Sequence, residues 1–160
     1  MALVLSATNN RSFFINHTEV KTVINHNKSM GLVFTVHGEE QVEHLSRVGS
    51  RVNILGVTVT LNPFFNNIIA KLAFDAPQHI VINTSKVYYN VTRATGGKLL
   101  SRRAYNYLHK HSGMNRETID RIVCKAAEVK TEDDGTVILE AGRLQFYMRT
   151  NVIHRVEINE

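Results

Sequence analysis

The sequence predicts a mainly β N-terminal domain followed by a small α+β domain. Short apolar or alternating runs, separated by Asn, Gly and His clusters, continue as far as residue 92 and are typical of strands. The paired glycines at 96 and 97 then interrupt the chain, and two amphipathic helical patterns and three strands with hairpin spacing follow them. We therefore expect a β domain at 1–92, a linker at 93–97 and an α+β accessory domain at 98–160.

The strands expected in the first domain have one apolar side. Val57, Val59 and Leu61 alternate with two threonines, and a second alternating set lies at 32–36. Such strands must pack against another sheet or against a copy of themselves. The ranges expected to be strands are 12–16, 20–25, 32–36, 52–55, 57–61, 68–74 and 80–82.

A weak internal repeat runs through the same region. The pattern at 20–25 matches that at 57–62, and the pattern at 32–36 matches that at 70–74 at nearly the same offset. Phe13 and Ile15 precede the first set as Val52 and Ile54 precede the second. The repeat predicts two copies of one unit within the chain.

The accessory domain begins with helical periodicity. Apolar side chains fall on one face of 98–111 and basic side chains on the other, and Gly113 suits the helix end. Asn115 suits the N-cap of a second helix, from 116 to about 129. Strands expected at 136–140, 143–149 and 152–158 would form a three-stranded antiparallel sheet.

Charge is distributed unevenly along the 160 residues. Residues 47–93 carry a net charge of +4 and residues 94–125 a net charge of +5, whereas residues 126–160 carry −3. A basic segment suits a polyphosphate partner. No apolar run approaches the roughly 20 residues that span a bilayer, and the single cysteine, Cys124, has no intramolecular partner. We expect a cytoplasmic protein without a membrane partner, and a buried Cys124 thiol.

Residues 45–89 carry a series of short motifs in a specific order. They are Leu45-Ser46-Arg47-Val48-Gly49, Asp75-Ala76-Pro77, Ile80-Val81-Ile82 and Val87-Tyr88. This order resembles the carbon storage regulator family, small dimeric proteins that bind messenger RNA and repress translation. Leu3-Val4-Leu5-Ser6 resembles the opening strand of a more diverged copy. The resemblance covers residues 2–90, and it implies two fused copies that form an internal pseudo-dimer.

The resemblance also implies an RNA site. In the family, RNA is held by an arginine after the Leu-Ser pair and by a His-Arg pair in the last strand; targets carry single-stranded GGA-type loops. Arg47 matches the first arginine. Asn83-Thr84 replaces the His-Arg pair, and Ala7 and Leu45-Ser46 stand at the corresponding positions of the first copy.

We therefore expect a non-catalytic RNA-binding regulator of translation, monomeric or homodimeric, without a cofactor or metal. The basic face of 98–110 would contribute phosphate contacts, and Phe64-Phe65 would offer a surface on which a base could stack. The residues expected to bind RNA are Arg47, Arg51, Arg102, Arg103 and Lys110.

Two alternatives remain open. The order of elements after residue 98 faintly resembles colicin- and RelE-type endoribonucleases, with His109 and His154 for proton transfer and Arg149 for the phosphate. A regulator fold that has lost its RNA arginines could instead be a mimic or decoy that binds a host protein. A metal site is not expected, because His109 and His111 point to different faces of a helix.

Overall fold

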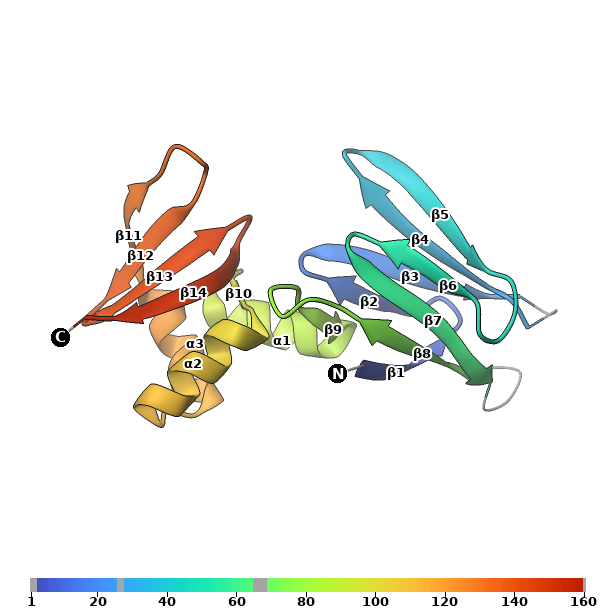
Figure 1. The fold of residues 1–160 in the computed structure, drawn as a ribbon, viewed down its shortest axis with the longest axis horizontal. Coiled ribbons are helices and arrows are strands. Elements are labelled where there is room, and N and C mark those ends of the chain that lie inside the picture. The colour runs from blue at the N-terminus through green and yellow to red at the C-terminus, as the bar shows by residue number, and fades with distance from the viewer. Residues whose placement is uncertain (1–2, 26–27, 65–68, 160) are drawn as a thin grey trace. The chain divides into compact units, whose positions relative to one another are not determined.

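The computed structural model describes residues 3–25, 28–64 and 69–159, and the chain divides into two compact units. Unit 1 comprises Met1–Pro77 and Ile82–Ser85, and unit 2 comprises Gln78–Val81 and Lys86–Glu160. The described residues form fourteen strands and three helices (Figure 1). The prediction of a mainly β chain is therefore confirmed.

Unit 1 consists of two antiparallel sheets. The five-stranded sheet has the order β5-β4-β3-β2-β9, and the four-stranded sheet has the order β1-β8-β7-β6. The strands are β1 (Leu3–Thr8), β2 (Ser12–Ile15), β3 (Thr18–Ile24), β4 (Met30–Val36), β5 (Glu39–Leu45), β6 (Arg51–Ile54), β7 (Val57–Phe64), β8 (Ile69–Asp75) and β9 (Ile82–Thr84).

The apolar faces of the two sheets form the core of unit 1. Val57, Val59 and Leu61 of β7 are fully buried, as their alternation with threonine predicts. Phe13 of β2 meets Phe74 of β8 edge to face, with ring centroids 4.8 Å apart, and so joins one sheet to the other.

The two halves of unit 1 exchange their outer strands. Consecutive strands β2, β3 and β4 are neighbours in one sheet, and β6, β7 and β8 are neighbours in the other. β1 pairs with β8 of the second half, and β9 pairs with β2 of the first half, whereas β5 follows β4 through the turn at 37–38 and lies beside it. Each sheet therefore contains one strand from the other half of unit 1.

Unit 2 packs two helices on one face of a five-stranded sheet with the order β10-β14-β13-β12-β11 (Figure 1). β10 runs parallel to β14, and the other pairs are antiparallel. Leu108 of α2 and Ile119 of α3 share a core with Leu139, Phe146 and Ile153 of the sheet. The elements are α1 (Ser85–Thr95), β10 (Leu99–Leu100), α2 (Arg102–Ser112), α3 (Arg116–Lys125), β11 (Ala127–Thr131), β12 (Val137–Ala141), β13 (Leu144–Arg149) and β14 (Val152–Ile158).

Several details of the second domain differ from the sequence-based expectation. The sheet is five-stranded and mixed, not three-stranded and antiparallel, because β10 and β11 add to its two edges. Residues 93–97 are not an open linker: 93–95 end helix α1, and Gly96 and Gly97, with φ of 70° and 94°, form the turn after it.

Three further expectations concern the burial of Cys124, the loop at Phe64-Phe65 and the absence of a membrane-spanning segment. Cys124 is exposed, because it lies about 100° around α3 from the buried Val123. Phe64-Phe65 falls outside the residues whose side chains the structure describes. In the described part of the chain, no helix is long and apolar enough to cross a membrane.

Candidate nucleic-acid interface

Arg47 lies in a tight loop between β5 and β6. The Ser50 hydroxyl accepts a hydrogen bond from the Arg47 amide at 3.1 Å, and the Ser50 amide donates to the Arg47 carbonyl at 3.0 Å. Gly49, with φ of 90°, turns the chain so that its amide donates to the Leu61 carbonyl at 2.8 Å. The loop backbone is thus fixed by its own hydrogen bonds, and the side chains of Arg47 and Arg51 are exposed beside it.

The other expected RNA contacts lie on α2, in unit 2. Ser101 caps this helix, because its hydroxyl accepts a hydrogen bond from the Ala104 amide at 3.1 Å. Arg102 and Arg103 follow in the first turn and are exposed, as is Lys110 in the last turn. Positive charge in the first turn of a helix opposes the helix dipole, so these two arginines cost the helix stability.

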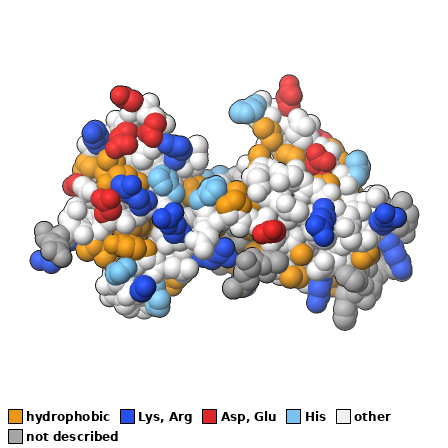
Figure 2. Space-filling model, in the orientation of Figure 1, with side chains coloured by type: hydrophobic (Ala, Val, Ile, Leu, Met, Phe, Trp, Pro, Cys, Tyr) orange, Lys and Arg blue, Asp and Glu red, His pale blue; other side chains and the backbone are white. Residues whose placement is uncertain are grey.

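The face of unit 2 seen in Figure 2 carries Asp and Glu side chains among its Lys and Arg side chains. Positive charge is therefore mixed with negative charge on this face and does not form a continuous basic stripe. Phosphate contacts on this unit depend on particular arginines and lysines, not on a uniform field.

A second group of polar side chains lies on the face of the unit 2 sheet that the helices leave uncovered. Tyr147 pairs with Arg155 and Ile138, and Gln145 pairs with Glu157 and Glu140. These positions alternate with the core residues Phe146, Leu139 and Val156, so they point away from the helices. We call this surface the polar face; among its ionisable and hydroxyl-bearing residues are Thr136, Glu140, Tyr147, Arg149, His154, Arg155 and Glu157, with Asp134 at its margin.

The two arginines of the polar face are held by carboxylates. Arg149 donates to Asp134 at 2.7 Å and to the Thr136 hydroxyl at 3.2 Å. Arg155 donates to Glu157 at 2.9 Å, and its guanidinium lies 3.9 Å from the centroid of the Tyr147 ring. Both arginine side chains are about half exposed, 54% for Arg149 and 55% for Arg155, so an incoming anion can compete with the carboxylates.

His154 occupies a β-bulge between these arginines. β13 and β14 shift register here, because Tyr147 pairs with Arg155 and the next residue, Met148, pairs with Ile153. The Nε2 atom of His154 is buried and has no hydrogen-bond partner among the described residues. Burial lowers the pKa of His154 below its ordinary value, and the charges of Arg149 and Arg155 lower it further. The imidazole is therefore neutral at pH 7 and able to accept a proton.

The structure brings together only part of the catalytic set expected from sequence. Arg149 and His154 share the polar face. His109 lies on α2, the helix that covers the opposite face, where its Nδ1 is 2.9 Å from the Met114 carbonyl oxygen. The expectation that His109 joins them is therefore wrong, because α2 packs on the apolar side of the sheet.

The sequence-based site also omitted Tyr147 and Glu157. The alternation of apolar and polar residues along β13 placed Tyr147 on the side opposite Phe146, and this signal could have identified it. The Tyr147 hydroxyl donates a hydrogen bond to Glu157 at 2.9 Å. This contact depends on the register that the bulge at His154 sets, and no sequence pattern indicated the bulge. Within the described ranges, no group of three or more His, Cys, Asp or Glu residues could hold a metal ion.

Comparisons with protein-family models, with curated proteins and with solved structures find no match to this chain. The resemblance to the carbon storage regulator family therefore rests on the quoted motifs.

Proposed function

We propose that the protein binds RNA and acts in post-transcriptional control, with unit 1 a fused pair of carbon-storage-regulator-like copies. The observation that carries the proposal is the exchange of two strands between the halves of unit 1: β1 pairs with β8, and β9 pairs with β2. Two copies of one fold that trade strands share a single core, which is what an internal pseudo-dimer requires.

The repeat found in the sequence supports the same reading. Its paired patterns fall on β2 and β6, on β3 and β7, and on β4 and β8, in the same order within each sheet. The strand β5, which ends at Leu45 just before Arg47, corresponds to β1 in position, because β5 pairs with β4 as β1 pairs with β8.

The proposed RNA contacts of unit 1 are Arg47 and Arg51. Both side chains are exposed, and no hydrogen bond or ion pair engages either side chain among the described residues. An arginine fork of this kind suits bidentate contact with a phosphate or with the O6 and N7 atoms of guanine. Arg102, Arg103 and Lys110 of unit 2 add phosphate contacts.

Fluorescence anisotropy with a hairpin RNA that carries a GGA loop tests this proposal. We expect the double variant Arg47→Gln/Arg51→Gln to bind at least about tenfold more weakly, since each lost arginine contact is worth about 1–3 kcal/mol. Arg143→Gln, which removes an exposed arginine from the β12–β13 turn, is the matched control. Unchanged affinity in the double variant would exclude these two arginines as the RNA site.

The polar face favours a second candidate, metal-independent endoribonuclease activity. A neutral imidazole beside two arginines supplies a base and the cations for cleavage through the 2′-hydroxyl, although no side-chain acid is assigned. His154 would take the proton of the 2′-hydroxyl while that oxygen attacks phosphorus and forms a 2′,3′-cyclic phosphate. Arg149 and Arg155 would stabilise the charge on the phosphorane, and the departing 5′-oxygen would take a proton from water. The imidazole must turn toward the surface when RNA binds, because its Nε2 atom is buried.

End-labelled RNA incubated with the protein in EDTA tests this second candidate. Cleavage with cyclic-phosphate ends, abolished in His154→Gln and retained in His109→Gln, would support it. An intact substrate, or equal cleavage by both variants, would exclude His154 as the base. The decoy hypothesis would gain support instead if the protein retained neither RNA binding nor cleavage and formed a stoichiometric complex with another protein.

A further inference from the structure

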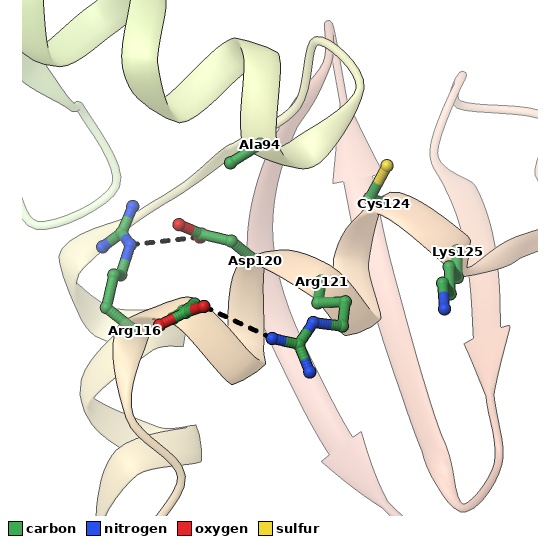
Figure 3. A pocket seen from close by; sticks show the side chains of 7 residues that line it. Ala94, Arg116, Asp120, Arg121, Cys124 and Lys125 are labelled. Atoms are coloured by element: carbon green, nitrogen blue, oxygen red, sulfur yellow. Dashed lines mark hydrogen bonds and ion pairs between the residues drawn. The ribbon is translucent and has the colours of Figure 1, made fainter.

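A groove of about 540 Å³ lies within unit 2, between the end of α1 and the outer side of α3 (Figure 3). Ala94 of α1 forms one side, and Asp120, Arg116 and Cys124 of α3 are among the residues on the other. A volume of this size accommodates a small organic ligand. The groove is separate from the polar face, since α3 packs on the opposite side of the sheet.

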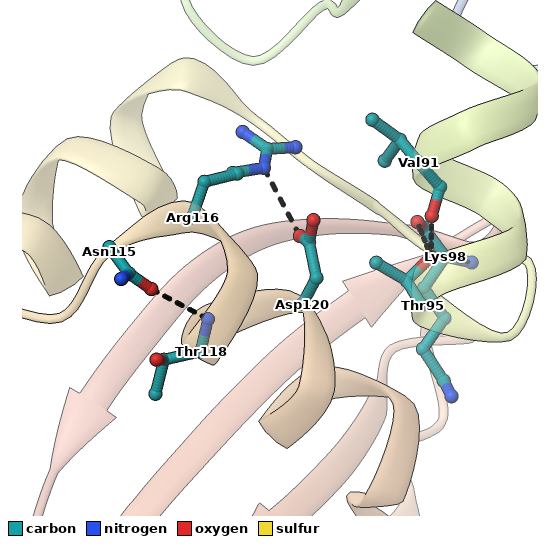
Figure 4. Close-up of polar contacts among 7 residues, drawn as sticks. All are labelled: Val91, Thr95, Lys98, Asn115, Arg116, Thr118 and Asp120. Atoms are coloured by element: carbon teal, nitrogen blue, oxygen red, sulfur yellow. Dashed lines mark hydrogen bonds and ion pairs between the residues drawn. The ribbon is translucent and has the colours of Figure 1, made fainter.

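Asp120 is the unusual residue of this groove. It is only 7% exposed. Buried carboxylates in proteins are usually fully paired, but this one is not. Its Oδ1 atom accepts a hydrogen bond from Arg116 Nε at 3.1 Å, while its Oδ2 atom accepts none from the described residues (Figure 4). Burial raises the pKa of Asp120 even though the adjacent guanidinium opposes that change. The carboxylate thus has unused acceptor capacity inside a groove.

Arg116 has unused hydrogen-bond donors, whereas Asp120 has an unused acceptor. Its Nε atom is used by Asp120, and its guanidinium lies 4.9 Å from the centroid of the Tyr105 ring, which fixes its plane. Neither Nη group has a hydrogen-bond partner among the residues that the structure describes. The arginine therefore retains N–H donors next to the carboxylate (Figure 4).

Arg116 and Asp120 together offer N–H donors beside two carboxylate oxygen acceptors. The Watson–Crick edge of cytosine likewise carries one donor and two acceptors, and guanine has the complementary O6 acceptor, N1–H donor and N2–H donor. Unpaired bases are commonly recognised through this edge. We propose that the groove between α1 and α3 binds an unpaired guanine base, with Asp120 accepting from N1–H and N2–H and Arg116 donating to O6.

The rim of the groove suits the phosphate of the same nucleotide. Lys125 is exposed and makes no ion pair among the described residues, and Arg121 is held only by an exposed contact of 3.4 Å to Glu117. A nucleotide whose base meets Asp120 would have its phosphate attracted by these two cations. If the groove selects a guanine within RNA, the inference rests on the proposed RNA binding. If it binds a free guanine nucleotide, the inference is independent of that proposal.

Isothermal titration of the whole protein with GMP, IMP, AMP, CMP and UMP tests the inference. IMP is the sharpest comparison, because inosine differs from guanosine only in lacking the 2-amino group. We expect GMP to bind about tenfold or more tightly than the other four nucleotides. Asp120→Asn should abolish this preference, whereas Glu117→Gln, which removes an exposed carboxylate from the same groove, should retain it.

A second measurement covers the case in which Asp120→Asn does not fold. Arg116→Lys alters a side chain that is 43% exposed, keeps its charge and should also lose the preference for GMP. Cys124 lines the same groove, so GMP, but not AMP, should slow its alkylation by iodoacetamide. Equal affinity for all five nucleotides, or an unchanged preference in both variants, would overturn the inference.

The failure of this inference is distinguishable from failure of the proposed function. If the protein binds the GGA hairpin but shows no preference among free nucleotides, the guanine site is wrong and the proposed RNA binding stands. If GMP binds selectively but no RNA binds, the guanine site stands and the proposed function is wrong.

Discussion

His154 is the residue whose chemistry depends most on its surroundings. It was identified from sequence as a candidate base, but a single histidine in a strand pattern carries no information on its neutral state. That state comes from burial in the bulge and from Arg149 and Arg155 beside it. The same environment gives a prediction for stability.

We expect the stability of the protein to fall as pH drops below about 6.5, the ordinary pKa of histidine. Because the folded-state pKa of His154 is lowered, the unfolded chain binds the proton more readily between the two pKa values, and acid favours unfolding there. His154→Gln should lose less stability than the wild type between pH 7.5 and pH 5.5 in urea unfolding. His109→Gln is the control, and an identical loss in all three proteins would show that His154 is not the group responsible.

At the scale of single elements, the first helix of the accessory domain shows where sequence reasoning succeeds and where it stops. Its apolar face and its stop at Gly113 followed from periodicity and from glycine, and the structure places α2 there. Periodicity predicts a start at 98, whereas α2 begins at Arg102. Leu99 and Leu100 fit a helical pattern equally well, but they pair with Val152 and Ile153 of β14, which are about fifty residues distant in sequence. Local periodicity contains no information on such a pairing.

The cap of α2 should be worth a measurable amount of stability. Ser101→Ala removes the hydroxyl that accepts from the Ala104 amide and should lower the free energy of unfolding by about 1 kcal/mol. Asn106→Ala, at an exposed position of the same helix whose side chain makes no hydrogen bond with the described residues, leaves this cap intact and serves as the comparison. Chemical denaturation measures both, and equal stability of Ser101→Ala and wild type would show that the cap contributes nothing.

The first turn of α2 should show a conflict between stability and binding. Arg102→Glu/Arg103→Glu places negative charge where the helix dipole favours it, so each change should stabilise the helix by about 0.3–1 kcal/mol. The same double variant should bind RNA more weakly and with a flatter dependence on salt, since phosphate contacts are lost. Anisotropy at several salt concentrations, with Arg143→Glu as control, tests this. RNA affinity equal to that of the wild type would remove the helix from the interface.

At the scale of the whole molecule, the exchanged strands matter most. The repeated patterns predicted that the first half of the sequence contains two copies, and most strand positions followed from alternation. The pairing of β1 with β8 and of β9 with β2 did not follow, because register and partner depend on contacts between segments far apart in the chain. The side chains that meet on the polar face of unit 2 could not be predicted either, because their contacts also depend on strand register.

Strand exchange predicts that neither half of unit 1 folds without the other. A fragment of residues 1–38 lacks β5 and β9, and a fragment of residues 39–85 lacks β1. We expect each fragment alone to be unfolded by circular dichroism, and the two to regain strand signal when mixed. Independent folding of either fragment would contradict the shared core.

The RNA content of the purified protein tests the central proposal most directly. If the protein is an RNA-binding regulator, wild-type protein purified at low salt should carry RNA, seen as a raised ratio of absorbance at 260 nm to that at 280 nm and as nuclease-sensitive material on a gel. The variant with Arg47, Arg51, Arg102 and Arg103 all changed to glutamine should carry much less. Wild-type protein free of RNA, isolated with a stoichiometric protein partner, would contradict the proposal.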